Sequence, residues 1–146
     1  MKVEQILRRK DTRIITVRVG ESIEIAARLL RSENIGALVV KDVCRTEGNV
    51  VVGMLSERDI VRALLEHGPK VLQMSVSSLM SRTLITCSPE DSERHVLELM
   101  RKNHIRHLPV LDGHTLVGVI GLRDFVDLKL EELTEQEAAA APAPVH

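Results

Sequence analysis

The chain repeats itself, and this duplication limits its possible folds more than any other feature of the sequence. Residues 15–42 align with residues 85–112 without a gap, and nine of these 28 positions are identical. After a loop that is longer in the first copy, residues 52–61 match residues 117–126 at five of ten positions. A unit this small cannot cover its own apolar sheet face, so two copies packed on each other are predicted.

Each copy shows the pattern of a β-α-β-β-α unit preceded by a short helical turn. An apolar stretch (14–17 or 84–87) predicts a brief strand, and apolar residues at helical spacing after it predict an amphipathic helix. Two apolar runs follow, joined in the second copy by the turn Asp112-Gly113, which is typical of a hairpin. A helix closes each copy. The predicted fold class is α/β (α+β).

Four segments are predicted along the chain. They are repeat 1 over residues 1–68, a linker over 69–75, repeat 2 over 76–133 and a disordered tail over 134–146. The tail is predicted because it ends in a run of Ala and Pro and has no large apolar residue after Leu133 except Val145.

Composition excludes several classes of function. The net charge is −1, so no overall field attracts nucleic acid or anionic lipid. One Phe and no Trp or Tyr leave no aromatic platform for stacking bases. No apolar run approaches the ~20 residues of a membrane span. With only Cys44 and Cys87, both expected to be ordinary thiols, and no signal-peptide pattern, a cytoplasmic location is expected.

The string from Gly53 to Asp59 runs from a predicted strand into a predicted helix, and two interpretations of it stay open. In the first, Ser56 is an N-cap and Asp59 completes a capping box. In the second, the helix N-terminus and the Ser56 hydroxyl bind a phosphate, and Asp59 accepts hydrogen bonds from both hydroxyls of a ribose. The second copy keeps Asp124 but has Gly121 in place of the serine, which slightly favours a ligand.

Two β-α-β-β-α copies that each close with G-x-x-[S/T/G]-x-x-D resemble a pair of cystathionine-β-synthase (CBS) domains, also called a Bateman module. The resemblance extends from about Val3 to Leu130, and the string from Ile105 to Asp112 is similar to the family's second strand. It implies a stand-alone pair of repeats related by a pseudo-twofold axis and a homodimer formed through helices.

The resemblance also implies an adenosine nucleotide (AMP, ADP, ATP, NAD or S-adenosylmethionine) in the cleft between the repeats. Asp59 would hold the ribose and Ser56 a phosphate, while the other repeat's second strand would reach the phosphates. Aliphatic residues would enclose the adenine. The implied binding residues are Ile14, Ile15, Ile35, Gly36, Met54, Ser56, Arg58, Asp59, Arg106, His107 and, in the symmetry-related cleft, Asp124.

The symmetry-related cleft departs from the family's pattern. Gly121 has no hydroxyl, and the cross-repeat positions Gly36 and Ala37 bring no charge. The residues expected around a base in this cleft are Leu84, Ile85, Ile105 and Val119. The first cleft is therefore the predicted site, and the second is expected to be weak or empty.

Three functions are compared. The leading one is a regulatory sensor of adenine nucleotides that changes shape or partner on binding, with a client protein that is not identified. The alternative is an interaction scaffold that has lost nucleotide affinity. A small hydrolytic enzyme is disfavoured because no base–nucleophile pair is visible, and His104-x-x-His107 has no third metal ligand at a convincing spacing. Neither a catalytic cofactor nor a nucleic-acid or membrane partner is expected.

Overall fold

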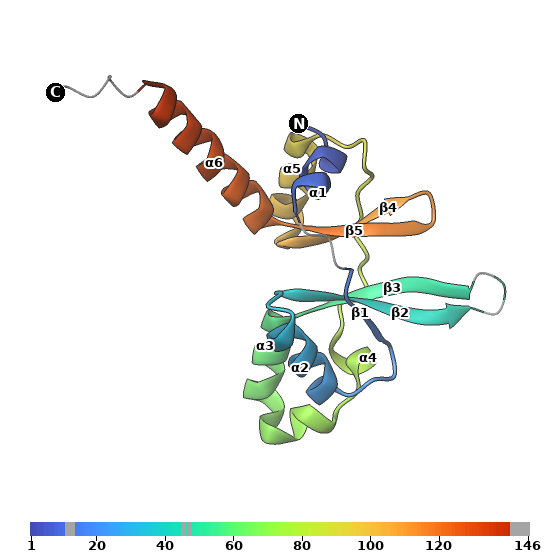
Figure 1. Ribbon diagram of the computed structural model, residues 1–146. Coiled ribbons are helices and arrows are strands. Elements are labelled where there is room, and N and C mark those ends of the chain that lie inside the picture. The colour runs from blue at the N-terminus through green and yellow to red at the C-terminus, as the bar shows by residue number, and fades with distance from the viewer. Residues whose placement is uncertain (11–13, 45, 47, 141–146) are drawn as a thin grey trace.

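The computed structural model describes residues 1–10, 14–44, 46 and 48–140 and confirms the predicted class and repeat (Figure 1). The first half contains helix α1 (Val3–Arg9), strand β1 (Thr16–Arg18), helix α2 (Ile23–Ser32), strands β2 (Ala37–Cys44) and β3 (Gly48–Ser56) and helix α3 (Glu57–His67). The second contains a 3-10 helix, η1 (Gly68–Gln73), helices α4 (Val76–Leu79) and α5 (Glu93–Asn103), strands β4 (His107–Asp112) and β5 (Thr115–Gly121) and helix α6 (Leu122–Ala140).

The two sheets face each other across the middle of the molecule, and the helices lie outside them (Figure 1). In the first sheet β2 lies between β1, to which it is parallel, and β3, to which it is antiparallel. In the second, β4 and β5 form the equivalent hairpin, with a bulge at the matching position. Each of the amphipathic helices α2 and α5 begins at a serine N-cap, Ser22 or Ser92, whose side chain accepts a backbone N–H.

The strand predicted over 84–87 shrinks to one parallel bridge, between Cys87 and Val110. The Cys87 N–H donates to the carbonyl of Pro109 at 3.1 Å, and the Leu111 N–H donates to the carbonyl of Cys87 at 2.8 Å. Position 109 has no N–H of its own, so the ladder cannot continue toward Ile85.

The two short lead-in helices are exchanged between the repeats. Val3 and Ile6 of α1 are buried in the core of the second repeat, around Val96 and Leu108. Val76 of α4 is buried in the core of the first repeat. Each unit that buries a core therefore contains the lead-in of the other copy.

Backbone pairings hold each lead-in at its start. Lys2 bridges Ser92 at the start of α5, and its equivalent, Ser75, bridges Ser22 at the start of α2. After α4 the chain runs along β3, where Met54 and Ser81 exchange two backbone hydrogen bonds of 3.1 and 2.8 Å. Gly53 permits this approach, because a Cβ there would collide with the Ser81 carbonyl.

Helix α6 continues to Ala140 and projects away from the body of the protein (Figure 1). The sequence prediction ended the ordered chain at Leu133, so residues 134–140 are a correction: they are rich in Glu, Gln and Ala, which are strong helix formers. The rest of the predicted tail, 141–146, lies outside the described residues. Among the described helices, none has the length and apolar content to span a bilayer.

Candidate functional site

A cleft of about 460 Å³ opens between the two repeats and is lined by both. The first repeat contributes the start of β2, the end of β3 and the first turns of α3, and the second contributes the chain after α4 and the segment that leads into β4. The lining residues are Gly36, Ala37, Met54, Ser56, Glu57, Arg58, Asp59, Arg62, Ser81, Thr83, Ile85, Asn103, His104, Ile105, Arg106 and His107.

The N-terminus of α3 forms one wall of the cleft and carries the predicted capping box. The Ser56 hydroxyl accepts the Asp59 N–H at 3.3 Å, and the Asp59 carboxylate accepts the Ser56 N–H at 2.9 Å. The Glu57 N–H donates to the Gly36 carbonyl at 3.0 Å, which fixes the helix against the start of β2. Both side chains are half-buried, and the positive end of the helix dipole faces the cleft.

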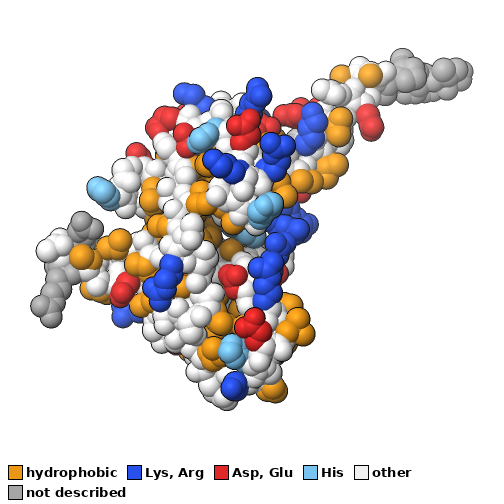
Figure 2. Space-filling view, turned by 180° about the vertical axis from the view of Figure 1, so that it is seen from behind, with side chains coloured by type: hydrophobic (Ala, Val, Ile, Leu, Met, Phe, Trp, Pro, Cys, Tyr) orange, Lys and Arg blue, Asp and Glu red, His pale blue; other side chains and the backbone are white. Residues whose placement is uncertain are grey.

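The cleft carries more positive than negative side chains. Three guanidinium groups line it, two from α3 (Arg58 and Arg62) and Arg106 from the second repeat, against the carboxylates of Glu57 and Asp59. Figure 2 shows Lys and Arg side chains gathered at the level where the halves meet, beside acidic and histidine side chains. This combination suits a ligand that bears both phosphate and hydroxyl groups.

The imidazole of His107 lies at the contact between the repeats. A Cβ built on Gly36 would lie 3.1 Å from its Cε1 and Nε2 atoms, and one on Gly121 would lie 3.3 Å from its Cδ2 atom. The absence of side chains at 36 and 121 thus makes room for the ring. Burial lowers the pKa of His107 from 6.5, and the charges of Lys10 and Arg106 lower it further, while Asp124 opposes them.

The cleft brings together seven of the predicted binding residues. These are Gly36, Met54, Ser56, Arg58, Asp59, Arg106 and His107. Ile14, Ile15 and Ile35 do not line it: Ile15 and Ile35 pack against the first core, and Ile14 is 38% exposed. The lining of the cleft therefore does not include these three residues, and their place in an adenine slot stays a prediction.

Besides Met54, the large aliphatic residues of the cleft come from the second repeat. Ile85 and Ile105, which the sequence prediction assigned to the other cleft, line this one. For Ile85 the cause is the exchange of the lead-ins, because the chain after α4 runs along β3 and carries Ser81, Thr83 and Ile85 to the first repeat's cleft.

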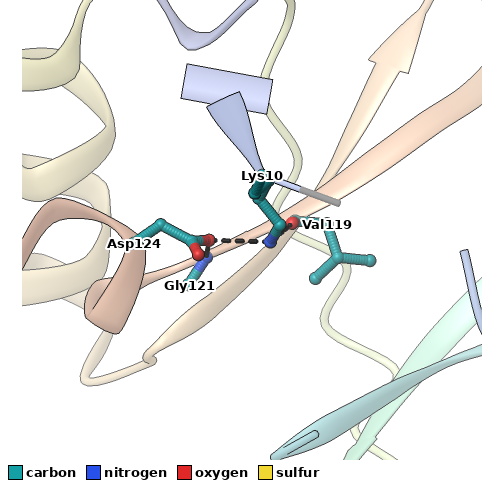
Figure 3. A network of polar contacts seen from close by, with 4 residues as sticks. All are labelled: Lys10, Val119, Gly121 and Asp124. Atoms are coloured by element: carbon teal, nitrogen blue, oxygen red, sulfur yellow. Dashed lines mark hydrogen bonds and ion pairs between the residues drawn. The ribbon is translucent and has the colours of Figure 1, made fainter. Parts of the chain in front are cut away.

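Asp124, the equivalent of Asp59, lies in a different environment (Figure 3). Its Oδ2 atom accepts the Gly121 N–H at 2.7 Å and the ammonium group of Lys10 at 2.9 Å. Lys10 donates a second hydrogen bond, of 2.8 Å, to the carbonyl of Val119. The carboxylate predicted for the second cleft is thus engaged by a cation of the protein itself.

Sequence reasoning missed several lining residues. Arg62 lies one helical turn after Arg58, so its spacing could have placed it on the same face of α3. Thr83 and Asn103 gave no such signal, because their position depends on how the repeats pack. His104 lines the cleft beside His107; within the described part of the chain, no three His, Cys, Asp or Glu side chains form a group that could hold a metal ion.

Neither cysteine lines this cleft. Cys87 belongs to the second core, where burial, aided by the charge of Asp91, raises its thiol pKa from 9.0 to about 12. A thiol of this kind is protonated and unreactive at neutral pH.

Comparisons with known proteins cover both repeats. A family model described as "CBS domain" matches residues 3–66 and 76–131. The CBS domain-containing protein YhcV of Bacillus subtilis (strain 168) is 33% identical over 130 residues, which are 89% of this chain and 86% of that protein.

Solved structures have the same fold. The CBS-domain containing protein ATU1752 from Agrobacterium tumefaciens superposes with a TM-score of 0.80 at 35% identity, over 88% of this chain and 92% of that one. The CBS domain pair of protein MJ0100, in complex with 5′-methylthioadenosine and S-adenosyl-L-methionine, has a TM-score of 0.76 at 26% identity, over 90% of this chain and 98% of that one.

Proposed function

This chain belongs to the CBS domain family, with one such domain in each repeat, and on that premise we propose that it is a regulatory sensor that binds an adenine nucleotide. The observation that carries the proposal is the open cleft in which Asp59, the N-terminus of α3 and three arginines meet. A relative of the same fold was solved with two adenosine-containing ligands, which supports an adenosine ligand here.

In the proposed complex, the carboxylate of Asp59 accepts hydrogen bonds from the ribose hydroxyls. The hydroxyl of Ser56 and the amide end of α3 bind a phosphate, a role that helix N-termini suit. Arg106 and His107 approach the phosphates from the second repeat. Charge-assisted hydrogen bonds of this kind each contribute roughly 1.5–3 kcal/mol when they are shielded from water.

The base is proposed to lie between Met54, Ile85 and Ile105, the aliphatic residues of the cleft. This slot replaces the one predicted from the sequence. With one carboxylate on the ribose, the three guanidinium groups favour AMP, ADP, ATP or NAD over the sulfonium cation of S-adenosylmethionine. Binding between the repeats would draw their strands and helices together, which can shift a surface that a client protein reads.

The interaction scaffold remains the second candidate, because the capping box already engages Asp59 and Ser56 with each other. Thermal unfolding in the presence of AMP, ADP, ATP, NAD and S-adenosylmethionine in turn decides between the two. A ligand at a hundred times its Kd adds about 2.7 kcal/mol to the free energy of unfolding. For a domain of this size, that raises Tm by roughly 5–11 °C. If none of the five ligands changes Tm, the interaction scaffold is the better account.

Two serine variants separate capping from ligand binding. Ser56→Ala and Ser92→Ala each remove an N-cap, at a typical cost of about 1 kcal/mol, but only Ser56 lines the cleft. Both variants should melt earlier than the parent, and only Ser56→Ala should also weaken the nucleotide. Asp59→Asn, which keeps an acceptor for the Ser56 N–H but loses the charge, should weaken it more. Equal nucleotide affinities in Ser56→Ala, Ser92→Ala and Asp59→Asn would mean that Ser56 and Asp59 only cap the helix.

We also propose that the protein acts without catalysis, as a cytoplasmic homodimer. In support, no hydrogen bond among the described residues joins a hydroxyl group of the cleft to His104 or His107, the contact through which a histidine would activate a nucleophile. Incubation with ATP followed by product analysis tests this, and release of ADP or AMP by the purified protein would contradict it.

A further inference from the structure

The two repeats present their helix carboxylates in the same local geometry. Asp59 and Asp124 both accept the backbone N–H three residues earlier, from Ser56 at 2.9 Å and from Gly121 at 2.7 Å. The first N–H of each closing helix also donates across to the residue before a hairpin strand, Glu57 to Gly36 and Leu122 to Arg106. By this geometry alone, both carboxylates are equally prepared for a ligand.

The two sites differ in the residue that the exchanged lead-in delivers to each. In the register that pairs Val3 with Val76, Lys10 is the equivalent of Thr83. Thr83 lines the open cleft and is exposed. Lys10 donates to the Asp124 carboxylate and to the Val119 carbonyl, at 2.9 and 2.8 Å. Val119 is the equivalent of Met54, a wall residue of the first cleft.

We propose that Lys10 acts as a built-in occupant of the second cleft, so that the protein binds one nucleotide per chain, at Asp59. This inference rests on the proposed function for the identity of the ligand. The ammonium group lies on the Oδ2 atom of Asp124, where it competes directly with a ribose hydroxyl for the carboxylate.

Burial makes this occupant hard to displace. The side chains of Lys10 and Asp124 are 33% and 21% exposed, and both atoms of the pair are already hydrogen-bonded within the protein. A nucleotide entering here must break two bonds of the ammonium group and return it to water. It gains little in exchange, because Gly121 has no hydroxyl and the residues predicted to reach this site from the first repeat, Gly36 and Ala37, have no charge.

Equilibrium dialysis with labelled ATP, AMP and NAD, each up to millimolar concentration, tests the proposal. Lys10→Thr introduces the residue that the first cleft has at the equivalent position 83, and Lys10→Met removes the charge while it keeps the length of the side chain. Each should add a second, weaker binding event that disappears on adding Asp124→Ala. Arg8→Thr, an equal loss of charge two residues away, should leave the stoichiometry unchanged. Circular dichroism checks that each variant is folded.

The reciprocal variant is Thr83→Lys, which places a lysine beside the open cleft. It should lower nucleotide affinity there at least about tenfold. Three results would each overturn the proposal. The parent protein could lose a bound nucleotide on Asp124→Ala, or the folded Lys10 variants could gain none. The third result is an unchanged nucleotide affinity in Thr83→Lys. A parent that binds no nucleotide, together with Lys10 variants that gain an Asp124-dependent site, would instead refute the function proposed for the first cleft.

Discussion

His107 lies between the open cleft and the Lys10–Asp124 pair, so its protonation affects both. Gly36 and Gly121 leave space for the ring, and no methyl group could be added at either position without crowding it. Burial of the ring disfavours its charged form and lowers its pKa. The lowered pKa therefore favours the uncharged form of this ring at neutral pH.

The lowered pKa of His107 predicts a pH-dependent loss of stability. The unfolded chain takes up a proton near pH 6.5, while the folded protein takes it up only at lower pH. The unfolded state thus binds more protons, and the free energy of unfolding falls as the pH drops below about 6.5, until the folded-state pKa is passed. Urea unfolding between pH 7.5 and 5 should show a smaller fall for His107→Gln than for the parent.

The groups that face His107 define the control. Asp124, Lys10 and Arg106 are the charges that act on it, and none of these is a histidine. His95 is exposed on α5, so His95→Gln should keep the parent's pH dependence. Parallel curves for His107→Gln and the parent would show that this ring does not govern the effect.

At the scale of elements, the sequence predicts what each copy contains better than where its pieces go. The amphipathic spacing of Ile25, Ala26 and Leu29 is local, and the helix lies where it was expected. The hairpin after Leu108 likewise follows from two apolar runs and a turn at Gly113. These elements depend on contacts between near neighbours in the chain, which a pattern records.

The exchange of the lead-ins has no local signal. The apolar residues of α1 match those of α4 whether each helix covers its own repeat or the other one. Backbone pairings between distant segments, such as Lys2 with Ser92 and Ser22 with Ser75, determine which repeat each lead-in helix covers. The same long-range choice moved Ile85 into the first cleft and Lys10 onto Asp124. The unexpected positions of Ile85 and Lys10 therefore have one cause.

The exchange of the lead-ins predicts which of the two cores a substitution in α1 or after α4 destabilises. Ile6→Ala, although it lies in the first copy, should loosen the second core, and Met80→Ala should loosen the first. Each should lower the free energy of unfolding by about 2–5 kcal/mol. Amide hydrogen exchange locates the effect: Ile6→Ala should speed exchange most in α5, and Met80→Ala most in α2. The opposite assignment would mean that the lead-ins are not exchanged in solution.

On the scale of the whole molecule, helix α6 has two apolar faces. Phe125 and Leu128 are buried in the second core. A separate stripe faces solvent at helical spacing and consists of Leu122, Val126, Leu130 and Leu133, which are 39 to 57% exposed. Figure 2 shows hydrophobic side chains along the projecting helix. Apolar surface of this kind marks an interaction site, and the proposed occupant is a second copy of the chain.

Helix α3 extends the same proposal, because its Val61, Leu64 and Leu65 are 59, 49 and 88% exposed. Both helices lie on the same side of the molecule in Figure 1. A surface that used both would couple dimerisation to the cleft, since α3 begins at the cleft residues Glu57 and Asp59. A nucleotide that shifts α3 would then shift the dimer equilibrium, and the dimer would change nucleotide affinity by the same factor.

The double variant Val126→Glu/Leu130→Glu tests this coupling. Two carboxylates in an apolar interface cannot both be buried without a large desolvation cost, so sedimentation velocity should show a monomer where the parent is a dimer. Glu135→Lys, a charge change of the same size on another face of α6, should leave the dimer intact. The nucleotide affinity of this monomer should differ from that of the dimeric parent. The factor should equal the one by which the nucleotide changes the dimerisation constant of the parent. A parent that is monomeric at all concentrations would show that there is no subunit contact. A double variant that stays dimeric would show that the contact lies elsewhere. In either case the exposed stripe would need a different partner.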